Sequence, residues 1–120
     1  MRYGHENMII YQNIDAIDML VQREIIPRIP KYYIKTKTQI DSASDSVGAN
    51  FVEGYYSGSL KEYLRFLGYS KRSLTEVHER VRRCLRKRFI DEQLYLKFKE
   101  LNNKTMYLFS RLRTKLEEKL

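Results

Sequence analysis

The fold of this chain is decided at Ser46-Val-Gly-Ala-Asn-Phe-Val-Glu-Gly-Tyr-Tyr-Ser-Gly-Ser-Leu-Lys-Glu62, where one predicted helix ends and the next begins. Gly54 and Gly58 bracket a tight connection, because glycine adopts positive φ at no steric cost and is favoured just past a helix end. Ser59 and Glu62 then match a Ser-x-x-Glu capping box, whose two side chains accept hydrogen bonds from early backbone amides. The stretch therefore predicts two helices joined by a tight turn.

The segment before this turn, residues 38–54, combines helical spacing with a composition that is poor in helix formers. Ile40, Ala43, Val47 and Phe51 recur at intervals of three and four, which is the period of a helix with one buried face. The serines, aspartate and glycine between them have low helix propensity. We follow the periodicity and predict a helix, whose small residues would let a neighbouring backbone come unusually close.

Three further segments show one apolar face at helical spacing, residues 7–26, 60–88 and 92–119. Two prolines end the first of them, because proline lacks an amide donor and disfavours helix in the residue before it. Residues 27–36 form the connecting loop. Its apolar side chains are expected to fold back onto the core: Ile29, Tyr32, Tyr33 and Ile34. Four amphipathic helices with short connections predict an all-α fold, an antiparallel up-down four-helix bundle.

Length and composition suit one such bundle. A chain of 120 residues, 42% of them hydrophobic, buries one modest core, so we predict a single domain over residues 1–120. The lone Cys84 excludes an intramolecular disulfide, and no Cys/His cluster has the spacing of metal ligands, so neither metal nor cofactor is expected. The chain starts without the apolar core of a secretory signal, and no apolar run approaches the roughly 18 residues of a membrane span. A cytoplasmic location is expected.

The positive charge is concentrated in the second half of the chain. The net charge is +8 and the isoelectric point about 9.6. Residues 1–60 hold six Lys or Arg against seven Asp or Glu, a net charge of −1, whereas residues 61–120 hold the other 17 against eight, a net charge of +9. Such asymmetry indicates a polyanionic partner, either nucleic acid or an acidic protein surface.

One face of the predicted helix over 60–88 is basic. Placed at 100° steps, its cations lie opposite the apolar stripe: Arg72, Arg80, Arg82, Arg83, Arg86, Lys87 and Arg88. Three more flank the stripe of the last helix: Lys97, Lys104 and Arg111. Guanidinium groups suit phosphate oxygens, so these ten residues are the candidate nucleic-acid contacts. The alternative is a solvated face with Glu76 to Arg80 and Glu79 to Arg83 pairs, each worth about 0.2–0.5 kcal/mol. Two acids cannot neutralise seven bases.

The remaining polar candidates favour structural roles. They are Ser46, Asn50, Glu53, Gly54, Ser59, Glu62, Ser73 and Glu76. We expect Asn50 and Glu53 to bond backbone or serine groups where the second and third helices meet, because buried polar atoms need partners. A hydrolase using Glu53 or Glu76 would lack a paired residue or metal site, so no catalytic residue is assigned.

Several single residues could carry chemistry but have structural alternatives. His78 falls on the apolar side of its helix, where a core or interface histidine is expected, and Cys84 is expected to be a small buried hydrophobe despite the nearby arginines. Four tyrosines could stack on bases, although packing at helix edges or subunit contacts is favoured: Tyr55, Tyr56, Tyr63 and Tyr69. Phe66 and Phe109 lie off the main apolar stripes and suggest self-association.

These residues resemble the bacterial four helix bundle proteins, which include the 23S rRNA intervening-sequence proteins and the accessory variability determinant of diversity-generating retroelements. The similar motifs are Gln39-Ile40, Ser46-Val-Gly-Ala-Asn50-Phe-Val-Glu53-Gly54, Ser59-x-x-Glu62-Tyr-x-x-Phe66-Leu67 and Ser73-Leu-Thr-Glu76-Val77. The chain departs from the family at Asp41-Ser42, where a basic pair is common, and at Arg72, where glycine is common. These departures argue against placing an RNA surface on the second helix by resemblance.

The resemblance implies an antiparallel bundle that assembles into a ring-like homopentamer without catalytic activity. For the retroelement member it implies association with a reverse transcriptase and nucleic acid. Together with the charge asymmetry, it predicts a basic homo-oligomer that binds RNA or DNA, structured RNA foremost, with no membrane or small-molecule partner. The alternative is a protein-binding scaffold, such as an accessory protein that docks a reverse transcriptase through the same basic surface.

Overall fold

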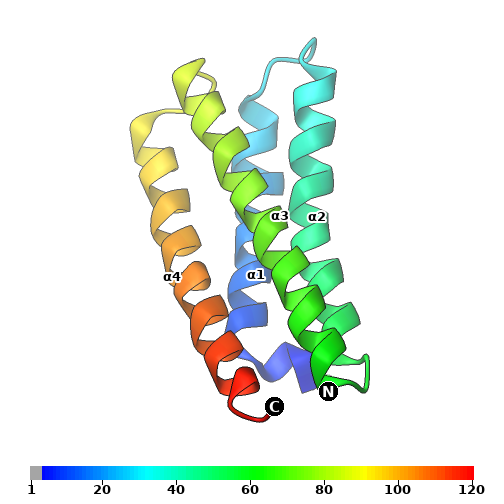
Figure 1. Cartoon of the computed structure of the whole chain (residues 1–120). Coiled ribbons are helices and arrows are strands. Elements are labelled where there is room, and N and C mark those ends of the chain that lie inside the picture. Colours follow the sequence, from blue (N-terminus) through cyan, green and yellow to red (C-terminus); the bar gives the residue numbers. More distant parts are fainter. Residues whose placement is uncertain (1–3) are drawn as a thin grey trace.

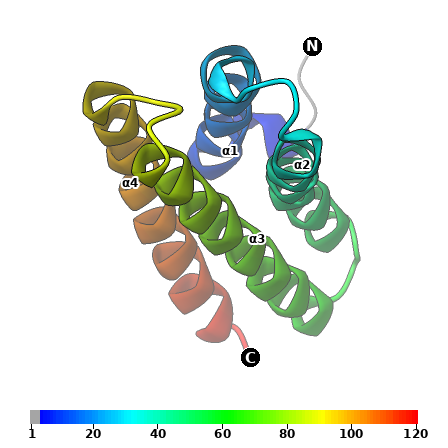
Figure 2. The same cartoon turned by 90° about the horizontal axis from the view of Figure 1, so that it is seen from above.

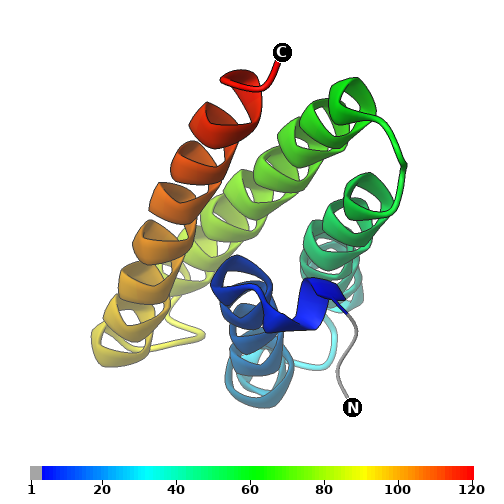
Figure 3. The same cartoon turned by 90° about the horizontal axis from the view of Figure 1, so that it is seen from below.

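The computed structural model describes residues 4–120, which form the predicted antiparallel four-helix bundle (Figure 1). A short 3₁₀ turn at Gly4–Asn7 precedes the bundle. The four helices are α1 (Ile9–Leu20), α2 (Ile34–Tyr55), α3 (Leu60–Arg86) and α4 (Glu92–Glu117). The bundle measures 46 × 28 × 23 Å. Its α1–α2 and α3–α4 connections lie together at one end, and the α2–α3 connection lies at the other end with the chain termini (Figures 1 and 3).

Each helix packs against two others, so that α1 and α3 lie diagonally opposite (Figure 2). The longest contact runs between α2 and α3, and α4 packs against α3 and α1. The apolar stripes converge on the axis, where the largest fully buried side chains lie: Phe51, Phe98, Phe109, Ile17, Ile25, Ile29, Ile40, Leu67 and Leu74. The structure therefore buries all four helical stripes in one core, as the amphipathic periodicity predicts.

The predicted first helix does not remain a regular α-helix to its end. Regular geometry stops at Leu20, and the chain continues through a π turn at Val21–Ile25 and a 3₁₀ turn at Ile26–Arg28. Pro27 has no amide to offer the helix, so the last turns adopt irregular hydrogen bonding before the chain leaves the axis. The Ile26 amide bonds the Val21 carbonyl, five residues back. Val21 and Ile25 stay buried through this change.

The second helix begins at Ile34, four residues before the predicted start. Its first turn faces solvent, with Ile34 69% exposed, so no apolar periodicity marked it as helical. The expected packing of the loop was half right. Ile29 is buried and Tyr33 half-buried, whereas Tyr32 is 81% exposed and Ile34 also faces water. Tyr33 is the ring that packs inward, 4.8 Å from the ring of Phe89 in the α3–α4 connection.

The close approach of α2 and α3 is confirmed at Gly54. A Cβ added there would lie 2.8 Å from the Phe66 Cβ and 3.3 Å from the Tyr63 carbonyl oxygen. Gly54 lies inside α2, so the expected positive φ is found only at Gly58, with φ of 76°. A second contact between these helices comes from Ser70, whose hydroxyl donates to the Val47 carbonyl at 2.5 Å. Small residues thus allow two backbones to pack closely along this seam.

The capping box at the start of α3 is only half formed. The Ser59 hydroxyl accepts from the Glu62 amide at 3.2 Å, as predicted. The Glu62 carboxylate instead pairs with Arg65 at 2.6 Å, and the Ser59 amide donates to the Ser57 hydroxyl at 3.4 Å. Arg65 binds the Glu62 carboxylate in place of the Ser59 amide, because a pair between two charged groups is stronger than a bond to a neutral amide.

The α3–α4 connection is a Schellman motif with arginine at the left-handed position. The Phe89 amide bonds the Cys84 carbonyl and the Arg88 amide bonds the Leu85 carbonyl, both at 2.9 Å. Arg88 has φ of 65°, the only positive φ among the described non-glycine residues. This position favours glycine, because a Cβ crowds the backbone there. Three residues after Arg88, Asp91 caps α4 by accepting from the Leu94 amide at 2.8 Å.

Two aromatic residues expected to lie off the core do not support self-association as proposed from the sequence. Phe109 is 1% exposed, and Phe66 is half-buried against Gly54. The sequence placed Phe109 outside the buried face of α4. A helix that packs against two neighbours buries a wider face than the single apolar stripe suggests, and Phe109 lies on that wider face. Among residues 4–120, no helix is long and apolar enough to cross a membrane.

Candidate nucleic-acid interface

The basic face consists of the cations on the outer side of α3 and directly after it: Arg72, Arg80, Arg82, Arg83, Arg86, Lys87 and Arg88. These residues come from successive turns of one helix, so their side chains follow its axis. All are exposed except Arg80, which is half-buried. The opposite side of α3 buries Leu67, Leu74 and Val77 in the core. The two-faced helix predicted from the sequence is therefore present in the fold.

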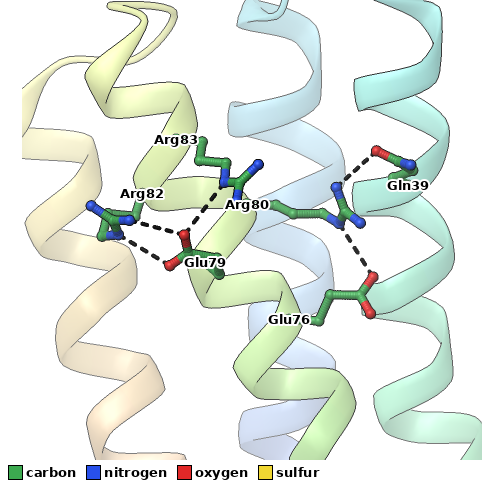
Figure 4. Close-up of polar contacts among 6 residues, drawn as sticks. All are labelled: Gln39, Glu76, Glu79, Arg80, Arg82 and Arg83. Carbon is green, nitrogen blue, oxygen red and sulfur yellow. Dashed lines mark hydrogen bonds and ion pairs between the residues drawn. The ribbon is translucent and has the colours of Figure 1, made fainter.

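Arg80 is held between two helices rather than left open to solvent (Figure 4). Its guanidinium contacts the Glu76 carboxylate at 3.2 Å and donates to the side-chain oxygen of Gln39 on α2 at 2.7 Å. Both bonds use up donors that a phosphate would otherwise receive. Arg80 thus serves the α2–α3 contact and offers fewer free donors to a ligand.

Glu79 holds the next two arginines at once. Its carboxylate accepts from Arg82 at 2.9 Å and from Arg83 at 3.3 Å (Figure 4). Hydrogen bonding from Arg82, reinforced by Arg83 and by the two positive charges, lowers the pKa of the Glu79 carboxyl to about 2. One carboxylate shared by two guanidinium groups cannot cancel both charges, so this part of the face remains positive.

Among the described residues, three of the four unpaired cations of the basic face lie at the C-terminal end of α3, and Arg72 lies near the middle of the helix. Within residues 4–120, the side chains of Arg72, Arg86, Lys87 and Arg88 have no ion pair. Arg72 lies 5.9 Å from the centre of the Tyr69 ring, and Lys87 lies 5.1 Å from the centre of the Tyr33 ring. Ring contacts of this kind leave the charge available to an anion. The pairs predicted within the face form, but four cations stay outside them.

The three candidate cations of α4 lie on another side of the bundle. Lys97 pairs with Glu24 at 3.0 Å and Lys104 with Glu100 at 3.4 Å, and both line a groove between α1 and α4. Arg111 lines a second α1–α4 groove and donates to a tyrosine hydroxyl of its own helix. These three therefore lie at grooves between α1 and α4, apart from the basic face on the outer side of α3.

The polar residues shared with the family motif play smaller roles than expected. Asn50 donates to the Ser46 carbonyl of its own helix at 2.9 Å, and Glu53 is exposed without a bonded partner among the described residues. Ser73 is half-buried and likewise makes no side-chain hydrogen bond within residues 4–120. Asn50 thus bonds a backbone carbonyl as expected, although within α2, whereas the bond expected of Glu53 does not form among the described residues. Polar contacts between helices come instead from Ser70 and from other pairs: Ser44 to Asp18 at 2.8 Å and Gln22 to Asp41 at 2.6 Å.

His78 and Cys84 have the environments of structural residues. His78 shares a hydrogen bond of 3.1 Å with the Tyr95 hydroxyl, and its ring also contacts Phe98. Burial, with Lys99 nearby, lowers the pKa of His78. Cys84 is 1% exposed, and burial raises the pKa of its thiol to about 11 in spite of Lys87. A thiol in that state is a poor nucleophile.

The four candidate tyrosines divide into two half-buried rings, Tyr55 and Tyr63, and two exposed ones, Tyr56 and Tyr69. Tyr55, Tyr56 and Tyr63 pack against one another near the α2–α3 turn, with ring centres 4.8 and 6.0 Å apart. Burial, with Tyr55 close by, raises the pKa of Tyr63 to about 12. Tyr69 lies on the surface of α3 within reach of Arg65 and Arg72. Packing, the favoured alternative, thus describes Tyr55 and Tyr63, whereas Tyr56 is 55% exposed although its ring contacts Tyr55.

One group of residues was missed by sequence reasoning. The α1–α2 connection and the first turn of α2 lie at the end of the bundle where α3 finishes (Figure 2). These segments contain Arg28, Lys31, Tyr32 and Lys35. In sequence these residues belong to a proline-containing loop, which carried no periodic signal. The signal that could have found this group is the presence of three cations and no acidic residue in the predicted loop over residues 27–36.

Comparison with protein families gives one match. A family model described as 23S rRNA-intervening sequence protein covers residues 6–111, nearly the whole bundle. A comparison with curated proteins found no match for this sequence. Among residues 4–120, no group of three or more His, Cys, Asp or Glu side chains is arranged to hold a metal ion.

Proposed function

The chain belongs to the 23S rRNA-intervening sequence protein family, and we propose that it is a non-enzymatic nucleic-acid-binding protein that uses the basic face of α3. The observation that carries the proposal is the set of four cations on this face that have no ion pair within residues 4–120. The family description, which refers to an intervening sequence of 23S rRNA, adds support for an RNA ligand. Structured RNA is the expected partner.

The chemistry of the face fits phosphate rather than base recognition. Guanidinium and ammonium groups along a helix neutralise backbone phosphates and release condensed counterions, which gives strong salt dependence and little sequence preference. Four free cations predict that log K falls against log salt concentration with a slope of roughly −3. The hollow on this face, about 320 Å³ and lined by Arg72, Glu76, Glu79, Arg80 and Arg83 among others, is open to solvent and does not enclose a nucleotide. The ligand therefore lies along α3.

The test compares two variants that remove the same charge from different sides of the bundle. The first carries Arg72→Gln, Arg86→Gln and Lys87→Gln on the basic face. The second carries Lys97→Gln, Lys104→Gln and Arg111→Gln in the α1–α4 grooves. Binding of a structured RNA is titrated at several salt concentrations by fluorescence anisotropy.

We expect the first variant to lose roughly 10-fold or more in affinity and its salt slope to fall to roughly −1. The second variant should bind nearly as tightly as wild type, because two of its three cations are already paired. Equal losses in both variants would mean that only net charge matters. Absence of wild-type binding near physiological salt, or binding indifferent to salt, would exclude the proposed function.

We also propose that the chain self-associates, with the pentamer as the expected stoichiometry. Large apolar side chains remain exposed along the side where α1 and α4 meet, with Ile9 66% and Tyr107 60% exposed, and both line one groove with Leu108. Covering such side chains on a second copy would remove apolar area from water. Light scattering at micromolar concentration tests this proposal, and a monomer would refute it.

The scaffold alternative uses the same basic face with an acidic protein as partner. The exposed side chains at the α1–α4 groove would suit protein contact as well as self-association. Gene neighbourhood separates the two functions. A reverse-transcriptase gene with template repeats beside this gene favours the scaffold, whereas a position inside a ribosomal RNA operon favours RNA binding.

A further inference from the structure

Two connections that are far apart in sequence form one basic surface at an end of the bundle. We call this surface the loop pole and define it as residues 27–35 and 86–90; both connections lie at the upper end in Figure 1 and face the viewer in Figure 2. Ring and cation contacts join them. The Tyr33 ring lies 4.8 Å from the Phe89 ring, and the Lys87 ammonium lies 5.1 Å from the centre of the Tyr33 ring.

The loop pole is rich in positive charge and contains no acidic residue. Residues 27–35 contribute Arg28, Lys31 and Lys35, and residues 86–90 contribute three more cations. Within residues 4–120, the side chains of Lys31, Lys35, Arg86 and Arg88 make neither an ion pair nor a hydrogen bond. Concentrated charge that the protein leaves unneutralised repels itself, so it favours an anionic ligand.

Arg28 and Arg88 come from different connections but line the same open hollow of about 680 Å³. Asp91 and Glu92, just outside the loop pole, also line this hollow. Both carboxylates lie at the start of α4, where the helix dipole offsets part of their charge, and Asp91 also accepts from the Leu94 amide. The hollow therefore has two guanidinium groups in its lining, and this group suits an oxygen anion such as a backbone phosphate; Arg28 also donates one N–H to the Glu24 carbonyl oxygen and keeps its other donors.

Arg88 occupies its position at a conformational cost. Its φ of 65° lies in the left-handed region, where a side chain costs about 1 kcal/mol or more relative to glycine. The Schellman motif would be better served by glycine. A strained residue is a reason to look for a function that its side chain performs. The side chain at this position is the guanidinium of Arg88, which lines the same hollow as Arg28.

Tyr32 supplies a flat surface beside these charges. It is 81% exposed, more than any other large apolar or aromatic residue of the described chain. Its ring centre lies 5.0 Å from that of Tyr33, at an interplanar angle of 39°, so the two rings are adjacent while most of the Tyr32 ring is open to solvent. An exposed aromatic ring among cations has the composition of a surface on which nucleic-acid bases stack.

From these observations we propose that the loop pole binds an unpaired nucleobase on Tyr32 while Arg28 and Arg88 hold the adjoining phosphate. This inference rests on the proposed function and sharpens it, because a base can reach Tyr32 only where it is not stacked in a duplex. The ligand class is nucleic acid with an unpaired loop, bulge or end. A backbone that follows the basic face of α3 from Arg72 to Arg88, about 24 Å at 1.5 Å per residue, arrives at this pole.

The test uses two probes and three single-residue variants of the full chain. The probes are a hairpin with an unpaired loop containing 2-aminopurine and a blunt duplex with the same stem, each made as RNA and as DNA. Tyr32→Ser removes the ring, Tyr32→Phe keeps it, and Tyr56→Ser is the matched control, because Tyr56 is 55% exposed near the α2–α3 turn at the opposite end. Binding is measured by anisotropy, and stacking by 2-aminopurine quenching.

We expect Tyr32→Ser to weaken hairpin binding roughly 10-fold and to abolish the quenching, without changing duplex binding. Tyr32→Phe and Tyr56→Ser should both behave as wild type. Equal effects of Tyr32→Ser on hairpin and duplex, or no effect on either, would overturn the stacking role while leaving the proposed function standing. A wild-type protein that binds neither probe overturns both. The RNA and DNA arms show which of the two sources of an unpaired base is bound.

Arg88→Gly tests the phosphate role without risk to the fold. This change relieves the positive φ, so urea unfolding should show a protein at least as stable as wild type. We expect binding of both probes to weaken and the salt slope to become less steep by about 1. A more stable protein with unchanged affinity would show that Arg88 does not contact the ligand, and would overturn this part of the inference.

Discussion

Replacing Gly54 by alanine should destabilise the bundle although it improves helix propensity. In a helix interior, alanine is favoured over glycine by about 1 kcal/mol. Here the new methyl would lie 2.8 Å from the Phe66 Cβ and 3.3 Å from the Tyr63 carbonyl oxygen. Both atoms are at or next to the α3 backbone, so neither can rotate away, and relief requires α2 and α3 to separate. Overpacking of this kind costs about 2–3 kcal/mol, which leaves Gly54→Ala less stable by about 1–2 kcal/mol.

Gly48→Ala is the matched control on the same helix. A Cβ at Gly48 would meet its nearest atoms at 3.6 and 3.9 Å, which is ordinary contact. That variant should therefore be more stable than wild type by about 0.5–1 kcal/mol. Urea unfolding followed by circular dichroism, at one fixed protein concentration, measures both changes. If Gly54→Ala proves as stable as Gly48→Ala, the α2–α3 seam is not closely packed at this position and the reasoning is refuted.

Three further predictions address a cap, a thiol and a carboxylate. Ser59→Ala should lower the free energy of unfolding by about 1 kcal/mol, because the Glu62 amide loses its partner. Ser59→Asp should keep most of the wild-type stability in the same urea titration, because aspartate also caps helices. Equal losses of stability in the two variants would contradict the cap. Cys84, buried and with its thiol pKa raised to about 11, should react with a thiol reagent at pH 8 only as fast as the protein unfolds, and rapid labelling without urea would show that it is accessible. The pKa of the Glu79 carboxyl is lowered from an ordinary 4.5 to about 2, so its stabilising effect is present above pH 4.5 and is lost as the pH falls towards 2. The difference in unfolding free energy between wild type and Glu79→Gln, measured by urea unfolding, should therefore shrink from pH 6 to pH 2.5. A constant difference would contradict the pairing of Glu79 with Arg82 and Arg83.

The sequence predicted the elements of the fold better than their ends. Helical periodicity placed four helices and their buried faces, because the 3.6-residue repeat is written locally along each segment. It placed the start of α2 at residue 38, since the exposed first turn from Ile34 shows no apolar repeat. Pro27 predicted the end of the first helix at residue 26, but regular α geometry stops at Leu20, and a π turn follows in which Val21 and Ile25 stay buried.

The sequence predicted which cations lie on the basic face of α3, but not their contacts with other helices. Spacing along α3 correctly joined Arg80 to Glu76 and Arg83 to Glu79, because neighbours one turn apart are set by the helix itself. It could not show that Gln39 of α2 also binds Arg80, or that Lys97 is paired across to Glu24. Those contacts join segments far apart in the chain.

By itself the sequence determined an all-helical bundle, the two-faced character of α3 and a tight turn at Gly58, because each depends on residues within a few positions of one another. Only the tertiary structure decided which cations remain free and what stands beside them. It placed the Tyr32 loop against the end of α3, buried Phe109 and left the Asn50 amide inside its own helix. The physical reason is that burial and pairing depend on which helices meet, and helix packing brings together residues that no local period connects.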